Sequence, residues 1–411
     1  MTPQSILYII LFISITSYLF DQFLDYLNLK YHRKDLPPEV ASFYDQEKYL
    51  KSIEYHRVQS RFSFITSAFS FALSLAMLWL GGFGWIDQYL HPFFTNEIVL
   101  ALAFFAVIAI VSDILTLPFQ LYSTFVIEEK FGFNKTTVKT FILDKLKNLI
   151  LGALIGGALL SVLIYLVQQI GPGFWIWFGL IASLFIVITN MFYSSLIIPL
   201  YNKLTPLQDG ELKTAIESFA RKVSFPLDNI FVIDGSKRSS KANAFFSGIG
   251  KKKKIVLYDT LINNHTTEEL VAVLAHEVGH FKKKHIIWSL IISVTQIFFI
   301  LFVLSLMIGN KNLSLALGGS QQAIHLNLVA FGILFSPISG ITGLLMSLYS
   351  RKNEFEADAY ARETFDGTAL ANALKKLSVD SLSNLYPHPA YVFFHYSHPT
   401  LLQRLDALKK N

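Results

Sequence analysis

Seven long apolar stretches constrain this chain more than any other feature of its sequence. A helix needs roughly 20 apolar residues to cross about 30 Å of hydrocarbon. Stretches of that length lie near residues 5–27, 62–82, 97–126, 148–168, 174–199, 286–309 and 325–349. Too few polar residues remain to coat a soluble surface, because 53% of the residues are hydrophobic and only 16% are charged. The sequence therefore predicts an all-α polytopic membrane protein with about seven transmembrane helices.

The basic residues gather on one side of the predicted membrane. Lys and Arg are frequent between the first and second stretches, between the third and fourth, in residues 200–285 and after residue 350. The loops of the other side hold almost none: none in 83–96 or 169–173, and only Lys311 in 310–324. The positive-inside rule then predicts a cytoplasmic C-terminus and a periplasmic or lumenal N-terminus. The expected location is a bacterial inner membrane, or the endoplasmic reticulum membrane in a eukaryote.

The net charge of +6 comes from these loops, so it indicates contact with anionic membrane lipid and not with nucleic acid. Two soluble segments alternate with the membrane helices. The expected division is 1–199 with five membrane helices, 200–285 as the first catalytic part, 286–350 with two more helices, and 351–411 as the second catalytic part. Both soluble parts lie on the basic side, so they can meet. The first has α+β character, with an amphipathic helix at 211–223, a strand at 229–234 and a hairpin at 243–258.

A short histidine motif carries the strongest chemical information. Residues 276–280 read His-Glu-Val-Gly-His, and on a helix His276 and His280 share a face and can bind one metal ion. Glu277 then lies beside the ion, placed to take a proton from the attacking water. A capping box at Thr266–Glu269 supports the helix, and Gly279 is expected to allow close approach to the metal. The alternative is two unrelated histidines on an ordinary helix.

A catalytic zinc ion takes three protein ligands and keeps one position open. The chain has no cysteine, so the third ligand must be His, Asp or Glu. Glu354 and Asp358 are four residues apart on a predicted helix, so they share a face, whereas Glu356 points elsewhere. Glu354 is the expected ligand, and Asp358 is expected to accept the outward N–H of a ligand histidine. A solvated acidic helix face is the alternative interpretation.

The motif also lies close to a membrane helix. His280 and Ile286 are six residues apart, or roughly 9 Å along an unbroken helix. A metal centre at that height is at the membrane surface. The substrate is therefore expected to be a peptide or protein that is lipidated or membrane-associated.

Motifs spread along the chain resemble those of the type I CAAX prenyl endopeptidases (the CAAX prenyl protease 1 family), which are integral-membrane zinc metalloproteases of the gluzincin type. The stretches that carry the resemblance are Phe125–Asn134, Pro199–Leu207, Asn243–Phe246, Lys254–Leu261, His276–His280, Glu354–Asp358 and His395–Leu405. Together they cover nearly the whole chain.

The resemblance implies one Zn²⁺ held by His276, His280 and Glu354, with Glu277 as general base. It also implies that Asn243 and His398 flank the scissile bond and stabilise the oxyanion. Without it, Asn243 reads as a turn residue and His398 as a surface histidine. The implied fold is seven helices around a hollow chamber with a cytoplasmic gluzincin-like domain, and the implied reaction removes the last three residues of isoprenylated CAAX proteins.

Two other functions remain open at this point. The first is a bacterial metalloprotease for membrane-protein quality control, which would act on substrates that are not prenylated. A non-enzymatic transporter with a structural zinc site is disfavoured, because Glu277 is of no use to a structural site and the ligands lie outside the spans.

Overall fold

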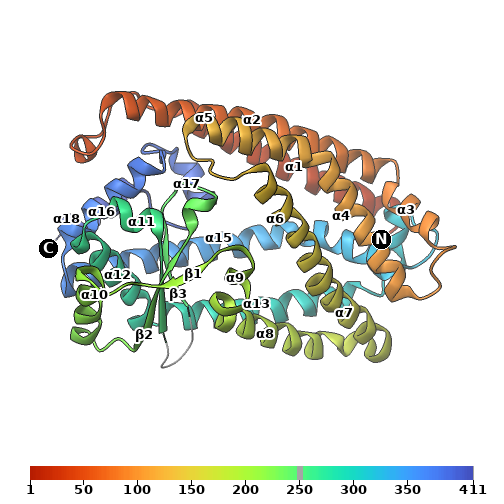
Figure 1. Ribbon diagram of the computed structural model, residues 1–411. Helices are drawn as coiled ribbons and strands as arrows, with labels where there is room; N and C mark the ends of the chain where they lie inside the picture. Colours follow the sequence, from red (N-terminus) through yellow and green to blue (C-terminus); the bar gives the residue numbers. More distant parts are fainter. Residues whose placement is uncertain (248–252, 411) are drawn as a thin grey trace.

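Long apolar helices run side by side and form most of the molecule (Figure 1). The computed structural model describes residues 1–247 and 253–410. Within these residues, 6 helices are long and apolar enough to cross a membrane: Pro3–Lys30 (α1), Gln46–Trp79 (α2), Glu97–Phe131 (α4 to α5), Val138–Tyr201 (α6 to α9), His285–Met307 (α13) and Ile324–Thr364 (α15).

The fourth of these helices supplies two membrane legs. A straight helix of 64 residues would be about 96 Å long, three times the hydrocarbon thickness. It turns back at Gly171–Gly173 (η4), where Gly171 adopts a φ of +64° that favours glycine. The parts of the two legs are Val138–Leu151 (α6), Gly152–Gly156 (η3), Gly157–Ile170 (α7), Phe174–Phe192 (α8), Tyr193–Ile197 (η5) and Ile198–Tyr201 (α9). The helices therefore give seven legs, in line with the seven predicted spans and the predicted hairpin.

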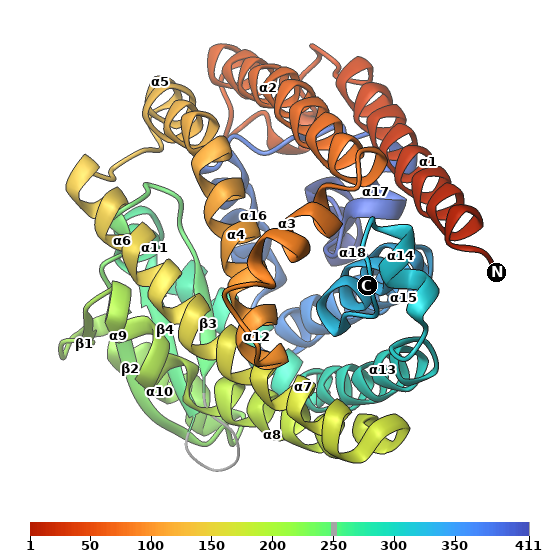
Figure 2. The same ribbon diagram turned by 90° about the vertical axis from the view of Figure 1, so that its right-hand side faces the viewer.

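Viewed from one end, the membrane legs form a ring (Figure 2). Polar side chains join neighbouring members of the ring. Lys145 on α6 donates to Asp113 on α4 at 2.5 Å and to Gln120 at 2.8 Å. A carboxylate in a membrane helix is costly unless it has such a partner, so Asp113 makes a helix–helix contact. The expected chamber inside the ring stays a prediction.

Two short helices close the end of the ring that lies away from the sheet (Figure 1). They are Gly82–Leu90 (α3) and Lys311–Ala316 (α14). The backbones approach so closely that a Cβ on Gly84 would lie 2.0 Å from the carbonyl carbon of Gly318. Buried Asp87 of α3 and buried His325 of α15 share a 2.8 Å hydrogen bond.

The first soluble part contains a four-stranded sheet with the order β1-β2-β4-β3. Its strands are Leu204–Pro206 (β1), Leu227–Ile233 (β2), Ala244–Ser247 (β3) and Lys253–Tyr258 (β4), and its helices are Glu211–Lys222 (α10), Asp259–Asn264 (α11) and Thr267–Lys282 (α12). β2 and β4 are parallel, and the two outer pairs are antiparallel. The predicted helix, strand and hairpin are confirmed, except that residues 248–252 of the hairpin lie outside the described residues. β3 is an edge strand.

The second soluble part packs against the first. It comprises the end of α15 and the helices Gly367–Asp380 (α16), Pro389–His395 (α17) and Leu401–Lys409 (α18). Apolar side chains of α12, α15 and α16 share one core with the sheet, among them Val278, Ala361 and Leu370. The two soluble parts meet, as the distribution of basic residues predicted.

One expectation about α12 was wrong. The helix does not continue into the next membrane leg but ends at Lys282, and α13 begins at His285. Lys284 lies between them with a φ of 60°, a left-handed conformation that an L-residue adopts only under constraint. The chain therefore bends between His280 and the membrane, so the estimate of roughly 9 Å along a straight helix does not apply.

Candidate metal centre

Helix α12 presents two histidines because its opposite face is fixed in the core. The predicted capping box is present: the Thr266 hydroxyl accepts from the Glu269 N–H, and the Glu269 carboxylate accepts from the Thr266 N–H. Apolar side chains then bury one face of the helix: Leu270, Val271, Leu274, Ala275 and Val278. His276 and His280 are left to face α15.

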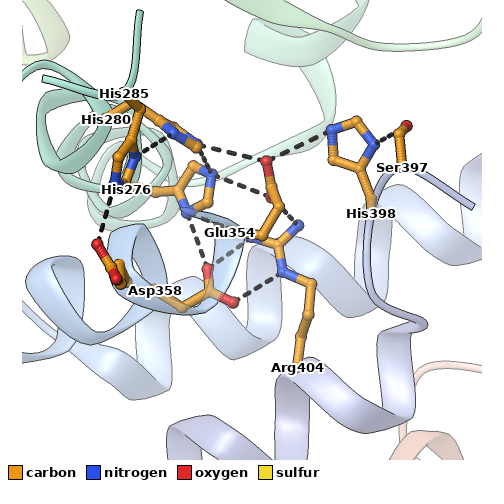
Figure 3. A network of polar contacts seen from close by, with 9 residues as sticks. His276, His280, His285, Glu354, Asp358, Ser397, His398 and Arg404 are labelled. Atoms are coloured by element: carbon orange, nitrogen blue, oxygen red, sulfur yellow. Dashed lines mark hydrogen bonds and ion pairs between the residues drawn. The ribbon is translucent and has the colours of Figure 1, made fainter. Parts of the chain in front are cut away.

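His276, His280 and Glu354 form a compact set of possible ligands, called here the ligand triad (Figure 3). The two Nε2 atoms lie 3.1 Å apart, and the Glu354 oxygens lie 3.5 Å from His276 Nε2 and 3.4 Å from His280 Nε2. Ligands about 2.0–2.1 Å from a tetrahedral zinc ion are about 3.3 Å from each other. The spacing therefore fits one metal ion.

The outward nitrogens of both histidines have partners of their own. His276 Nδ1 lies 2.8 Å from Asp358 Oδ1, and His280 Nδ1 lies 3.0 Å from His285 Nδ1. His285 Nε2 in turn lies 3.1 Å from Glu356 Oε2. Such contacts hold a ligand histidine with its other nitrogen toward the ion. Asp358 lies where the sequence predicted it.

Glu277 follows the first histidine and is half-buried. Burial raises the pKa of its carboxyl group above the ordinary value, against the opposing charges of His276 and His280. A raised pKa brings a carboxylate closer to the basicity that a general base needs near neutral pH.

The structure brings one of the two remaining predicted residues to the triad. His398 Nε2 lies 3.4 Å from Glu354 Oε1, and its ring is 63% exposed, so it is accessible to a substrate. Asn243 directly precedes the edge strand β3, is exposed, and uses its side-chain oxygen to accept from the N–H of Ala244 at 2.8 Å. No contact of the described residues joins Asn243 to the triad.

Two protein-family models match most of the chain. Residues 25–203 match the CAAX prenyl protease N-terminal region with five membrane helices, and residues 206–411 match peptidase family M48. CAAX prenyl protease 1 of Saccharomyces cerevisiae is 36% identical over 96% of this chain and 93% of its own. This chain belongs to the CAAX prenyl protease 1 family. It is therefore a membrane metalloprotease, and its substrates are peptides or proteins.

Other members of the CAAX prenyl protease 1 family agree in sequence and in fold. The homologue of Oryza sativa subsp. japonica is 38% identical, over 96% of this chain and 95% of its own. The crystal structure of S. mikatae Ste24p matches with a TM-score of 0.93 and 36% identity, covering 98% of this chain and 99% of that one. The likeness extends over both the membrane and the soluble parts.

Arg404, within the C-terminal motif, has a role in the site that the sequence does not indicate. Arg404 on α18 donates to both oxygens of Asp358, at 2.8 and 2.6 Å, and its Nη1 lies 3.4 Å from Glu354. Its side chain is only 13% exposed. A bidentate arginine fixes the plane of a carboxylate, so Arg404 holds Asp358 toward His276. No spacing rule links residue 404 to residue 276, which is why the sequence did not reveal this role.

The role expected of Gly279 was wrong in its target. A Cβ at this position would lie 3.0 Å from Ala357 Cα and 3.1 Å from Tyr360 Cβ. The glycine therefore permits close approach of α15, not of the metal.

We expect Gly279→Leu to push α15 away from α12 and to lower zinc affinity by at least tenfold, because Glu354 moves with α15. Competition with a chromophoric chelator measures this affinity, and Gly332→Leu, where a side chain meets open space, is the control.

Metal uptake is expected to depend on pH through His280. Burial alone would lower the pKa of His280, but its contact with Glu354 and the charges of Glu277 and Glu354 outweigh burial and raise the pKa above its ordinary value of 6.5. The ion competes with this proton, so affinity is full above the raised pKa and falls by about tenfold per pH unit below it. Zinc titrations of metal-free protein between pH 6 and 9 test this, and an affinity that stayed constant down to pH 6 would contradict it.

Proposed function

We propose that this chain is a zinc endopeptidase that cleaves lipid-modified CAAX-type proteins near their C-terminus at the cytoplasmic face of its membrane. The observation that carries the proposal is the ligand triad, whose spacing of 3.1 to 3.5 Å suits one tetrahedral ion. Two imidazoles and one carboxylate are the donor set of many catalytic zinc sites. The names of the relatives, CAAX prenyl protease 1 and its homologues, support the substrate class.

The side chains around the ion have distinct tasks in this proposal. When bound, zinc supplies a Lewis acid that polarises the scissile carbonyl and makes water more acidic. Glu277 takes a proton from the attacking water and delivers it to the leaving amine. His398 and Asn243 donate hydrogen bonds to the developing oxyanion. Asp358, itself held by Arg404, keeps His276 oriented.

A pocket on the membrane side of the triad supports a lipid-modified substrate. It has a volume of about 400 Å³ and lies between α8, α13 and α15, next to His280. Ile186, Phe246, Ile286 and Leu290 contribute apolar surface. Its lining includes no lysine, arginine, aspartate or glutamate among the residues described. Serine, asparagine and histidine side chains line the rest of this pocket, called here the uncharged pocket because it has no lysine, arginine or carboxylate. Its apolar side can receive the lipidated end of a peptide.

The distribution of charge supports the cytoplasmic side in this proposal. The two soluble parts that contain the ligand triad are rich in Lys and Arg, and the loops on the opposite side are nearly free of them. The membrane in question is a bacterial inner membrane or the endoplasmic reticulum. Protease protection of tags placed in the segment 310–324 and after residue 410, in sealed vesicles, tests the orientation.

The function itself is tested with one peptide sequence in two forms, farnesylated and unmodified. Purified protein in detergent is expected to cleave the farnesylated CAAX peptide, to lose this activity with a chelator and to regain it with zinc. Equal cleavage of the unmodified form would favour a quality-control protease. Cleavage that survives complete metal removal would overturn the proposal.

A further inference from the structure

The edge strand β3 runs between two pockets of different chemistry. Phe246, near the end of β3, lines the uncharged pocket beside His280. Lys241, two residues before Asn243, lines a second pocket of about 700 Å³, called here the basic pocket. The basic pocket also includes His398 and Arg404, which contact the ligand Glu354. The two pockets therefore extend from the triad toward opposite ends of β3.

The basic pocket is lined by cationic and neutral groups. It lies between α2, the segment before β3, the end of α16 and the segment between α17 and α18, and its lysine, arginine and histidine members include Lys241, His395, His398 and Arg404. Among the residues that the structure describes, no aspartate or glutamate lines it. Such a pocket favours an anionic ligand.

Among the described residues, Lys241 of the basic pocket pairs with one carboxylate, whereas Arg404 pairs with two. Its Nζ donates to the Tyr55 hydroxyl at 3.0 Å and lies 3.2 Å from Glu128 Oε2. The ring centre of Phe133 lies 4.3 Å from the same Nζ, so one side of the ammonium group packs on an aromatic face. Glu128 holds the lysine in place from behind the pocket and also accepts from Tyr55 and Gln59.

The two other basic side chains near the triad already have partners there. Arg404 is engaged by Asp358 and Glu354, and its side chain is only 13% exposed. His398 stands directly beside Glu354, where the scissile bond must lie. Lys241, with a side chain that is 39% exposed, is left for a group further along the substrate.

The different pockets at the two ends of β3 indicate the direction in which a peptide substrate binds. A lipid-modified residue fits the uncharged pocket at the membrane side, and the opposite end of the peptide then enters the basic pocket. The group that every peptide carries at that end is a carboxylate. In an extended chain, a carboxylate three residues past the scissile bond lies about 10 Å from it. The Cα of Lys241 is within about 7 Å of that of Asn243, and its long side chain extends the reach.

We propose that the basic pocket binds the C-terminal tripeptide that is released by cleavage, and that Lys241 binds its terminal carboxylate. This inference rests on the proposed endopeptidase function. Binding of the terminal carboxylate fixes how many residues lie between the cleaved bond and the end of the peptide. Lys241 therefore determines specificity without touching the reacting atoms.

The test compares three farnesylated peptides of one sequence: a free C-terminal carboxylate, a C-terminal amide, and a version extended by one residue. Wild-type protein is expected to favour the free carboxylate over the amide by roughly ten- to hundredfold in kcat/KM, the size of a charge-assisted hydrogen bond. Most of this factor should appear in KM. In Lys241→Gln the ratio should fall to near one, and Lys241→Arg should restore most of it.

Lys237→Gln is the matched control, because Lys237 is exposed, close in sequence, and outside the lining of the basic pocket. It should keep the wild-type ratio. A lysine that only stabilises the fold would lower the rates for acid and amide equally and leave the ratio unchanged. An equal rate for acid and amide in the wild-type protein, or a full ratio in Lys241→Gln, would overturn the inference.

Calorimetric binding of the free tripeptide, as acid and as amide, separates this inference from the proposed function. It needs no turnover, so it decides the role of Lys241 even in a protein that cleaves neither peptide. Tighter binding of the acid that is lost in Lys241→Gln supports the assignment. Equal binding of both forms contradicts it.

Discussion

Replacing Glu277 with glutamine is expected to abolish cleavage of a farnesylated CAAX peptide while zinc remains bound. The amide has the shape of the carboxylate but cannot accept a proton, and general-base catalysis contributes typically 10²- to 10⁴-fold. Glu277 is outside the ligand triad, so metal content should stay at one ion per chain. Steady-state kinetics with metal analysis of the same sample measures both quantities.

Glu268→Gln provides the matched control, because Glu268 is exposed in the first turn of the same helix. It should keep activity within about twofold. A Glu277→Gln protein that turns over normally would remove the general-base assignment. A Glu277→Gln protein that loses its zinc would instead show that the residue acts through the metal site.

Glu354→Ala is expected to cost the protein its metal and, with it, its activity. Structural zinc sites with four ligands bind with roughly 10–16 kcal/mol, so one ligand is worth about 3 kcal/mol, or more than a hundredfold in affinity. The loss has a second cause in this structure. Glu354 lies between the triad histidines and Arg404, so its removal leaves a buried guanidinium with fewer partners.

Chelator competition on refilled protein gives the zinc affinity of the Glu354→Ala variant, and thermal unfolding in detergent reports its stability. Glu363→Ala, at an exposed position further along α15, is the control and should match the wild type in both. Full zinc occupancy of Glu354→Ala at wild-type affinity would point to a different third ligand.

The membrane architecture could be predicted because each span is a run of consecutive apolar residues. Length and hydropathy identify a span locally, and the Lys and Arg count of each loop orients it. The bend at Lys284 could not be found in this way. The run Lys282–Lys284 contains neither glycine nor proline, and basic residues favour a helix end without fixing its position. The left-handed φ at Lys284 depends on how α12 and α13 are held by their surroundings.

The same distinction between local sequence and tertiary packing applies to the residues of the candidate site. The histidine pair and Glu354 with Asp358 follow from a spacing of four residues on a helix, which is local information. Arg404 and the pair His285–Glu356 act across separate helices, and only packing brings them to the triad. The close crossing at Gly279 is of the same kind, because its contact is with Ala357 in another segment.

The centre draws on parts of the chain that are synthesised far apart. His276 precedes the last two membrane legs, Glu354 and Asp358 follow them, and Arg404 is added later still. A growing polypeptide thus carries an unfinished protease until α13 and α15 have both entered the bilayer and α18 has docked. The metal centre is therefore complete only when the last two membrane legs and the C-terminal helix are all in place.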